Sequence, residues 1–472
     1  MRAYRTLAVI ATVALTACAN PRKADVGMPA AFEAPQSQAQ VALDQWWTAF
    51  NDPQLTTLVE QALAANTDVR TAAARLEEVR AQRTSVLMQF LPQGDLNARG
   101  SRTETTQLSG TRIDIPGFST SGTSESYAAN FNVAWEVDLF GRVFAAARAG
   151  NADVAATRYA YEGARAAIAA QVADSWFQAR GLAIQLADAR ETVRIRRDLY
   201  RVATRRAEVG VAATSDADRI AGDLAQAEAQ AALLEAELQA QKRALLILTG
   251  RMVEPTANID APPVVGAPPA VPATLPSELL ARRPDVREAE QRVRAAAGRQ
   301  DIAGLAFFPT LTLTPGVGWS KQSQPGFESE SRSWTIGGTL TQPILSIPRL
   351  LADLKVQNAR TEQAVLNYEK TVQTAFGEAE GALVRLDADR RRVALLTEGE
   401  RRAERGYRAA RTGYQRGLID LESTLTAEQS WRATRAQLTA AQVQALRRAV
   451  QAYRAIGGGW PGANTQTFAQ AR

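Results

Sequence analysis

Cys18 is the residue of this chain whose type and position most clearly predict a chemical modification. It is the only cysteine among 472 residues, and it ends the stretch LTAC. A short basic start with Arg2 and Arg5 and an apolar run over residues 7–15 precede it. That run is about half of the roughly 20 residues that a membrane-spanning helix needs. The pattern therefore predicts a cleaved signal peptide over residues 1–17, which leaves Cys18 at the new N-terminus.

The stretch LTAC resembles the bacterial lipobox, and this resemblance implies that Cys18 carries an S-diacylglycerol group and an N-palmitoyl group. A free cysteine is often simply a small buried apolar residue, but a residue inside a cleaved signal packs against nothing. In this class an aspartate after the cysteine implies retention at the inner membrane, and here Ala19 follows. We therefore expect a lipoprotein of the outer membrane, in which residues 18–50 form a lipidated N-terminal segment.

Few residues of the chain suit enzymatic or metal chemistry. Histidine is absent, and so is a second cysteine, which removes the commonest metal ligands and proton shuttles. The sequence contains no Walker-type glycine loop and no nucleophile–base arrangement. Glu136 and Asp138 lie on one face of a predicted strand without a companion base, so we expect them to line a lumen. The sequence predicts no enzyme, no cofactor and no metal site.

The charges of the chain are spread along it. The 55 basic and 49 acidic residues are interspersed and give a net charge of +6. A nucleic-acid-binding protein more often gathers its basic residues on one surface. The best candidate for such a surface, the arginine-rich stretch over residues 401–411, is better explained as a solvated helix face. We expect no nucleic acid partner.

The chain contains an internal duplication. Residues 66–92, NTDVRTAAARLEEVRAQRTSVLMQFLP, align without a gap on residues 283–309, RPDVREAEQRVRAAAGRQDIAGLAFFP. The spacing is a constant 217 residues, so that Pro92 falls on Pro309. Both prolines are expected to end a helix.

Each half of the duplication predicts short helices followed by paired strands. The short first helices are expected over about 52–65 and 277–283, and the next helices begin near residues 67 and 284. Alternating residue types over about ten positions suit strands of a membrane barrel, although a soluble sandwich has the same pattern. The predicted strands are 93–102, 127–139, 310–320 and 334–342. The polar segments 103–126 and 321–333 are expected to be extracellular loops.

Long helical tracts follow the strands in both halves. Neither tract contains proline, and both are rich in good helix formers. About 65 residues at roughly 1.5 Å each make a rod near 100 Å. Each rod is expected to turn at a glycine, Gly210 or Gly417, in the left-handed conformation. The rods are predicted over 142–209 and 350–416, the return helices over 214–249 and 420–456, and a Pro-rich linker over 261–276.

Four strands with one apolar face predict assembly with further copies of the chain. The smallest membrane barrels need about eight strands, and open edges in lipid leave backbone groups unpaired at several kcal/mol each. Two copies would supply eight strands and three copies twelve. Long helices with an apolar stripe also need partners. The alternative is a lipid-anchored periplasmic coiled-coil protein with a structural or interaction role, whose strands pair outside lipid.

The order of these parts resembles the TolC-like outer membrane factors, of the NodT and OprM lipoprotein type. The stretches that carry the resemblance are WWTAFNDPQL (46–55), WEVDLFGR (135–142), RRPDV (282–286) and TQPILS (341–346). The resemblance covers almost the whole mature chain. It implies a mainly α-helical fold with a membrane β-barrel, in which four strands per protomer form a 12-stranded trimeric barrel. This barrel would continue into a long antiparallel α-helical barrel.

The resemblance also implies a function and partners. The protein would be the passive outer-membrane exit duct of a tripartite efflux system. Its partners would be two further copies in a homotrimer, a periplasmic adaptor (membrane fusion protein), an inner-membrane pump of the RND type, and outer-membrane lipid. The expected domains are a first outer membrane factor repeat over 51–260, the linker over 261–276, a second repeat over 277–457 and a tail over 458–472.

In this family the adaptor meets the turns between the long helices. The matching residues here are Val209, Gly210, Val211, Arg416, Gly417 and Leu418. Glycine at these positions also suits helix capping without any partner, so docking is an addition to that structural role.

A closed-state latch and gate are implied only in part. Asp216, six residues after the first turn glycine, and Tyr414, three before the second, match the family's latch, although Asp216 also suits a helix N-terminus. The family often has aspartates six and nine residues after the second glycine, where this chain has Ser423 and Thr426. This departure argues against a strongly cation-selective gate unless other acids, Asp420 or Glu422, compensate.

Overall fold

The computed structural model describes residues 26–34, 43–106, 108–109, 122–211, 213–272, 274–324, 326–416 and 418–459. The predicted signal peptide, Cys18 and most of the predicted tail lie outside these residues. The described residues form two compact units. The sheet unit takes its residues from Glu77–Ala156 and Glu290–Asn367, and the coil unit from Asp25–Leu76, Thr157–Ala289 and Tyr368–Arg472.

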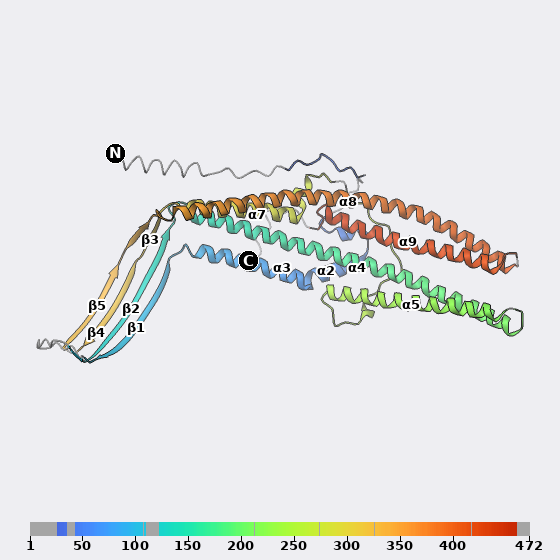
Figure 1. The fold of residues 1–472 in the computed structure, drawn as a ribbon, viewed down its shortest axis with the longest axis horizontal. Helices are drawn as coiled ribbons and strands as arrows, with labels where there is room; N and C mark the ends of the chain where they lie inside the picture. The colour runs from blue at the N-terminus through green and yellow to red at the C-terminus, as the bar shows by residue number, and fades with distance from the viewer. Residues whose placement is uncertain are drawn as a thin grey trace. The chain divides into compact units, whose positions relative to one another are not determined.

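The helices follow the duplicated order expected from the sequence (Figure 1). The first half contains α2 (Pro53–Ala65), α3 (Thr67–Met88), α4 (Arg142–Glu208) and α5 (Thr214–Leu248). The second half contains α6 (Glu278–Arg282), α7 (Pro284–Leu305), α8 (Ile347–Gln415) and α9 (Leu421–Ala455). Two short 3-10 helices are η1 (Trp46–Phe50) and η2 (Thr256–Asn258).

The long helices α4 and α8 have 67 and 69 residues. Neither contains a proline after its first turn, so no missing donor or ring clash interrupts the backbone hydrogen bonds. At about 1.5 Å per residue, each is roughly 100 Å long. Within the described part of the chain, none of the helices combines the length and the apolar character that a membrane crossing requires.

The strands form one antiparallel sheet (Figure 1). Its strands are β1 (Gln93–Thr105), β2 (Gly122–Val137), β3 (Thr310–Leu313), β4 (Gly316–Gln324), β5 (Phe327–Thr335) and β6 (Gly338–Thr341). β2 pairs with β1 on one side and with β3 and β4 on the other, β4 pairs with β5, and β3 with β6. The four predicted strands are therefore present as four runs, and the two in the second half are interrupted.

The interruptions in the second half lie side by side. Pro315 separates β3 from β4 and has no N–H for the ladder. Its carbonyl nevertheless accepts from Val133 N at 2.9 Å, and Thr314 N donates to Gly337 O at 2.8 Å between β5 and β6. The sheet thus continues across both breaks.

One of the predicted loops is wrong. Residues 321–333 belong almost entirely to the hairpin of β4 and β5, whose register runs to Gln324 opposite Phe327. The polar residues of this segment pair across the strands: Lys321 Nζ lies 2.7 Å from Glu328 Oε1, and the Ser320 and Ser331 hydroxyls are 2.9 Å apart. The other predicted loop is shorter than expected, because β1 extends to Thr105 and β2 begins at Gly122.

The main hydrophobic core lies in the coil unit. Trp46 of η1 is almost fully buried and stacks on Tyr453 of α9 with ring centroids 5.9 Å apart. Phe50 lies 5.0 Å from Phe177 of α4. η1 belongs to the segment expected to serve as a lipidated N-terminal region, so the last residues of that segment are part of the folded core.

Asp52 ties the first short helix to α4. Its Oδ1 accepts from the Gln54 and Leu55 amides at 3.1 Å and caps α2, whose first residue is a proline. Its Oδ2 accepts from Trp176 Nε1 at 2.8 Å and from Arg180 Nη1 at 2.5 Å. The Asp-Pro pair of the WWTAFNDPQL stretch therefore begins a helix and fixes its contact with α4.

The duplication is visible in contacts at the helix ends. Asn66 and Arg283 occupy equivalent positions and both reach the last residue of the return helix in their own half. Asn66 Nδ2 donates to Leu248 O at 3.0 Å, and Arg283 Nη1 donates to Ala455 O at 3.1 Å. The two halves thus make the same contact with different side chains.

Two glycines after the return helices are equivalent in the same way. Gly250 and Gly457 have φ of 73° and 80°. A Cβ at Gly250 would lie 2.8 Å from the Ala65 Cβ, and one at Gly457 would lie 2.9 Å from the Arg282 Cβ. Both positions need glycine for the left-handed conformation and for the close approach of a neighbouring helix end.

The Pro-rich linker packs on the coil unit instead of spanning a gap. Tyr453 Oη donates to Ala270 O at 2.7 Å, and Arg390 Nη2 donates to Pro269 O at 2.5 Å. Ala261 and Val271 are buried. The linker is therefore fixed to the folded chain at its first residue and again at residues 269–271.

Candidate functional site

The sheet has one apolar face and one polar face. The cross-strand register places apolar residues of neighbouring strands beside one another on one face and polar residues beside one another on the other. The apolar face carries Leu96, Ala98, Phe131, Val133, Trp135, Val137, Leu311, Leu313, Val317, Trp319, Trp334 and Leu340. In the single chain these side chains are largely unprotected, and Trp334 is 78% exposed. In the run through β3 and β4 this band extends from Leu311 to Trp319, close to the roughly 9–11 residues that a tilted strand needs to cross a bilayer.

Charged side chains continue the apolar face toward the β4–β5 turn. Arg102 Nη1 lies 3.6 Å from Glu125 Oε1. Trp319 Nε1 donates to Glu330 Oε1 at 2.8 Å. Aromatic residues at the edge of an apolar band with charges beyond them are typical of the lipid–water boundary of a barrel.

Hydroxyl and amide groups dominate the opposite face. It includes Asn97, Ser101, Ser126, Asn130, Asn132, Ser320, Gln322, Ser329, Ser331 and Ser333. The Asn130 side chain lies against Gly318, where a Cβ would be 2.5 Å from its Oδ1. β4 therefore needs glycine at this position so that the side chain of the neighbouring strand can lie across it.

The corner between β2 and α4 uses both acids that were expected to line a lumen. Asp138 Oδ1 accepts from the Gly141 and Arg142 amides at 2.8 Å, and its Oδ2 accepts from Val143 N at 3.0 Å. Glu136 Oε1 lies 2.8 Å from Arg142 Nη1. Gly141 has φ of 84°. The WEVDLFGR stretch therefore encodes a strand-to-helix corner, in which Asp138 caps α4.

The first turn between long helices has the predicted left-handed glycine. Gly210 has φ of 73°. Its amide donates to Ala207 O at 3.0 Å, and the Val211 amide donates to Arg206 O at 2.9 Å. These bonds close α4 in the manner of a Schellman motif. Val209 and Val211 are exposed on either side, so the turn presents apolar side chains to solvent.

The second turn repeats part of this geometry. The Leu418 amide donates to Gly413 O at 2.8 Å, which is equivalent to the bond made by Val211 in the first turn. Leu418 is exposed, and Arg416 donates from its amide to Thr412 O at 3.2 Å. Gly417 lies outside the described residues.

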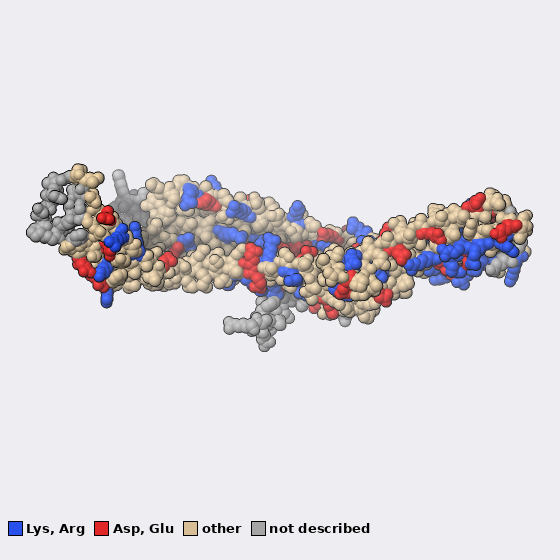
Figure 2. Space-filling model, turned by 90° about the horizontal axis from the view of Figure 1, so that it is seen from below, with Lys and Arg blue, Asp and Glu red and all other residues tan. Residues whose placement is uncertain are grey.

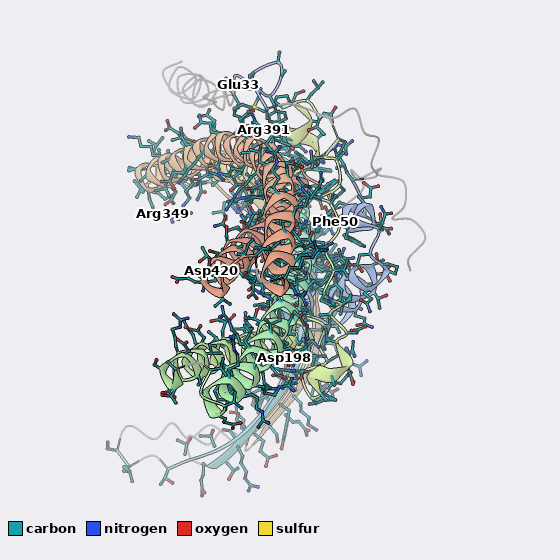
Figure 3. All side chains as sticks on the ribbon, turned by 90° about the vertical axis from the view of Figure 1, so that its right-hand side faces the viewer. Glu33, Phe50, Asp198, Arg349, Arg391 and Asp420 are labelled. Carbon is teal, nitrogen blue, oxygen red and sulfur yellow. The ribbon has the colours of Figure 1, made fainter. Side chains whose placement is uncertain are left out.

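The proposed latch stays a prediction. Asp216 is exposed in the first turn of α5, and the side chain of Tyr414 lies outside the described part of the chain. The view along the helices toward the turns shows Asp198 on the α4–α5 pair and Asp420 on the α8–α9 pair (Figure 3).

Asp420 and Ser423, two of the residues expected near the gate, cap the start of α9. The Ser423 amide donates to Asp420 Oδ1 and its hydroxyl donates to Asp420 Oδ2, both at 2.7 Å. These bonds hold the pKa of Asp420 below its usual value. Thr426 Oγ1 donates to Glu422 O at 2.9 Å. Ser423, at one of the two positions that differ from the family pattern, thus stabilises the carboxylate of Asp420.

A seam between α4 and α9 joins the two pairs of long helices and was missed by sequence reasoning. Arg447 Nε and Nη2 donate to Asp174 at 2.6 and 3.0 Å. Arg435 Nε and Nη2 contact Asp188, each at 2.9 Å, and hydrogen bonding to Asp188 raises the pKa of Arg435. Gly181 lies on α4 between the two aspartates of these ion pairs. Partners more than 200 residues apart leave no local pattern that could reveal them.

At Gly181 the seam is at its tightest. A Cβ on Gly181 would lie 2.5 Å from Val443 Cγ2. Only glycine lets α4 and α9 approach this closely without displacing Val443.

The arginine-rich stretch over residues 401–411 is a solvated helix face, as expected. Arg401 and Arg402 contact Glu398 at 2.9 and 2.7 Å, one turn away on α8. Figure 2 shows basic and acidic side chains mixed over much of the visible surface, with basic side chains gathered at the right-hand end of the view. Among the described residues no cluster of three or more His, Cys, Asp or Glu side chains could hold a metal ion.

Comparison with known proteins places these features in one family. The protein-family model described as outer membrane efflux protein matches residues 58–251 and 275–458. The chain is 29% identical to the cation efflux system protein CusC of Escherichia coli O6:H1, over 98% of this chain and the whole of that one. It is also 29% identical to the probable outer membrane lipoprotein SilC of Salmonella typhimurium, with 88% of each chain covered.

A solved structure gives the same result for the fold. The open-state MtrE outer membrane channel of Neisseria gonorrhoeae matches with a TM-score of 0.80 and 25% identity, over 93% of this chain and 97% of that one. The matches confirm the predicted efflux role, the outer-membrane location and a mainly helical fold with a barrel-forming sheet. The chain belongs to the outer membrane efflux protein family.

Proposed function

We propose that this protein is the passive exit duct of a tripartite efflux system and that three copies form one channel. A periplasmic adaptor and an inner-membrane pump of the RND type would supply the cargo and the energy, and the duct itself would catalyse no reaction. Membership of the efflux family supports the general role. The pump would select the cargo, so the duct needs no resident metal or cofactor.

The observation that carries the proposal is the two-faced sheet with two open edges. In the described chain β1 pairs only with β2, and β5 pairs only with β4. A bilayer cannot satisfy the free backbone groups of these outer strands. Because β1 and β5 run in opposite directions, β5 of one copy can pair antiparallel with β1 of the next. Three copies of four runs would close a barrel of twelve strands with the polar face inward.

Reconstitution into planar bilayers tests the duct. The lipidated protein should run as a heat-modifiable trimer, need detergent for extraction and conduct ions in bilayers. The alternative, a lipid-anchored periplasmic coiled coil, predicts protein that carbonate extracts once the lipid is removed and bilayers that stay silent. That pair of results would overturn the proposal.

The exposed turns are the proposed docking sites for the adaptor. Val209, Val211 and Leu418 present apolar side chains beside the turn glycines, as the tip of a helical partner would require. Replacing Gly210 and Gly417 together with Asp should abolish export without lowering the amount of trimer. The matched control replaces both with Asn, which tolerates left-handed φ without adding charge. Unchanged drug tolerance of the Asp variant, in a strain that depends on this protein, would remove the turns as docking sites.

Three further roles belong to this proposal. Asp216 and Tyr414 would form the closed-state latch between the two helix pairs. Cys18 would carry the lipid that anchors the N-terminus. Because Ser423 and Thr426 stand where the family often has aspartates, the gate would carry less negative charge than the family pattern, and Asp420, which Ser423 keeps ionised, would supply part of what remains.

A further inference from the structure

The polar face of the sheet carries few charges. Cross-strand register assigns every described strand residue to one of two faces. On the polar face the charged side chains are Asp95, Arg99 and Glu136. Glu136 is neutralised by Arg142 at 2.8 Å. Asp95 and Arg99, both on β1, therefore set the charge of this face.

Arg99 is the single Lys or Arg on the polar face of the described strands. It lies opposite Ala128 of β2, whose small side chain leaves room above the strand. It is exposed and makes no ion pair or side-chain hydrogen bond among the described residues. Arg102, three residues further along β1, points to the other face and pairs with Glu125. The same strand thus carries a free cation on one face and a paired one on the other.

Asp95 does not cancel this charge. Asp95 and Arg99 are four positions apart, which is about 14 Å along a strand. The Debye length at physiological salt is about 8 Å, so the two charges act on separate zones of the same face. The zone around Arg99 is otherwise lined by uncharged groups, including Asn97, Ser101 and Ala128.

We propose that Arg99 determines charge preference at the exit of the duct, where three copies form a ring of guanidinium groups that attracts anionic cargo groups such as carboxylates and phosphates. The proposal rests on the channel function proposed above. Rings of Arg or Lys favour anions in pores, and a guanidinium binds planar anions by two parallel hydrogen bonds. A cargo with an anionic group is concentrated at this level, and a cationic cargo is disfavoured.

The expected size of the effect follows from screening. A barrel of twelve strands leaves a lumen whose radius is comparable to the Debye length, so the ring produces a potential on the order of kT at 0.1 M salt. This changes the local ratio of anions to cations by roughly two- to five-fold, and at 1 M salt, where the Debye length is about 3 Å, the difference disappears.

A reporter thiol measures this ratio without requiring an open gate. Ser101→Cys places a thiol on the polar face two residues from Arg99, and acylation occupies the native Cys18. The purified protein in lipid nanodiscs is reacted with an anionic and a cationic methanethiosulfonate reagent, and protein without the reporter gives the background rate. Adding Arg99→Gln should lower the anionic-to-cationic rate ratio by roughly two- to five-fold at 0.1 M salt.

Two controls make the result specific. Arg102→Gln removes the same charge from the opposite face three residues away and should leave the ratio unchanged. Arg99→Lys keeps the charge and should retain the ratio, which separates an electrostatic role from a structural one. The trimer band of each variant shows that it has assembled.

Two outcomes would overturn the inference. One is an unchanged ratio in an assembled Arg99→Gln variant, and the other is an equal change with Arg102→Gln. Either result, in protein that still conducts ions in bilayers, removes the role of Arg99 and leaves the duct intact. Silent bilayers with protein extracted by carbonate would instead remove the proposed function itself.

Discussion

Arg283 connects the start of α7, the middle of α8 and the end of α9 through one guanidinium group. It precedes α7 and donates to Asp285 at 2.6 and 3.0 Å, to Glu378 of α8 at 2.7 Å and to the last carbonyl of α9 at 3.1 Å. Burial opposes its charge, yet the bonds to Asp285 and Glu378 raise the pKa of Arg283. The sequence showed that the RRPDV stretch is distinctive, but only the structure shows which arginine is buried.

Arg283→Ala should destabilise the coil unit by about 2–3 kcal/mol, because several charge-assisted hydrogen bonds are lost together. The carboxylates that remain are half-exposed and can be hydrated, which limits the cost. Thermal unfolding followed by circular dichroism measures the change. The neighbouring Arg282→Ala is the control, since Arg282 is exposed and makes one 3.8 Å ion pair with Glu278. Equal losses in both variants would contradict the assignment.

Asp420 gives a pH-dependent contribution at the start of α9. Its pKa is lowered by the amide and hydroxyl of Ser423. The stabilisation is therefore present above the unfolded-state pKa of about 3.9 and is lost as the pH falls through the lower folded-state pKa. Asp420→Ala should speed amide hydrogen exchange in the first turn of α9 at neutral pH. This difference from the unmodified protein should shrink under acid.

Glu422→Ala is the control for Asp420. Glu422 lies in the same first turn, but its carboxylate makes no hydrogen bond or ion pair among the described residues. Its replacement should change exchange less than Asp420→Ala does. A larger effect at Glu422 would mean that charge near the helix end matters more than the hydrogen bonds of the cap.

Elements could be predicted where the cause is local. The start of α2 at Asp52 and Pro53, the unbroken length of α4 and the turn at Gly210 follow from a capping acid before a proline, absent prolines and a glycine, all of which are visible in the sequence. The hairpin over residues 321–333 could not be predicted in this way, because its polar residues are stabilised by partners on the opposing strand. The breaks beside Pro315 and Gly337 likewise depend on a neighbouring strand that keeps the sheet continuous.

Two glycine-to-alanine substitutions, one on α4 and one on α5, should change the stability of the protein in opposite directions. Gly181→Ala places a Cβ 2.5 Å from Val443 Cγ2 in the α4–α9 seam and should destabilise the protein by about 1–3 kcal/mol. Gly222→Ala on α5 meets nothing within 4 Å and should stabilise by up to about 1 kcal/mol through helix propensity. Thermal unfolding compares them. Val443→Ala should destabilise the Gly181→Ala background less than it destabilises the unmodified protein, because it removes the clash. Equal losses in the two backgrounds would show that the contact is not the cause.

At the scale of the molecule, the open sheet edges and the duplicated order were sufficient to predict an assembly in the membrane. The physical reason is that lipid cannot satisfy backbone hydrogen bonds, which holds for any sheet of this kind. The ion pairs Asp174–Arg447 and Asp188–Arg435 could not be predicted, since they join residues from opposite halves of the chain. The charged residues of the polar face could be identified only after the strand register had assigned each residue to one of the two faces.

Cys18→Ser should separate the two modes of membrane attachment. The variant would lose the proposed acyl groups, but the apolar face of the sheet should still supply most of the membrane burial, so some barrel should form. Membrane fractionation and the trimer band on unheated gels measure this. Protein that is fully soluble and monomeric after this change would show that the lipid, and not the strands, holds the chain in the membrane.

The linker offers a practical consequence for labelling. Two of its residues, Ala261 and Val271, are buried in the coil unit, and between them Gly266 has no atom within 4 Å of the position that a Cβ would take. A short epitope or fluorophore-binding peptide inserted at Gly266 should be exposed to solvent and should not strain either repeat. Antibodies or dyes could then report on a working channel through a label that lies outside the residues proposed for lipid contact and adaptor docking.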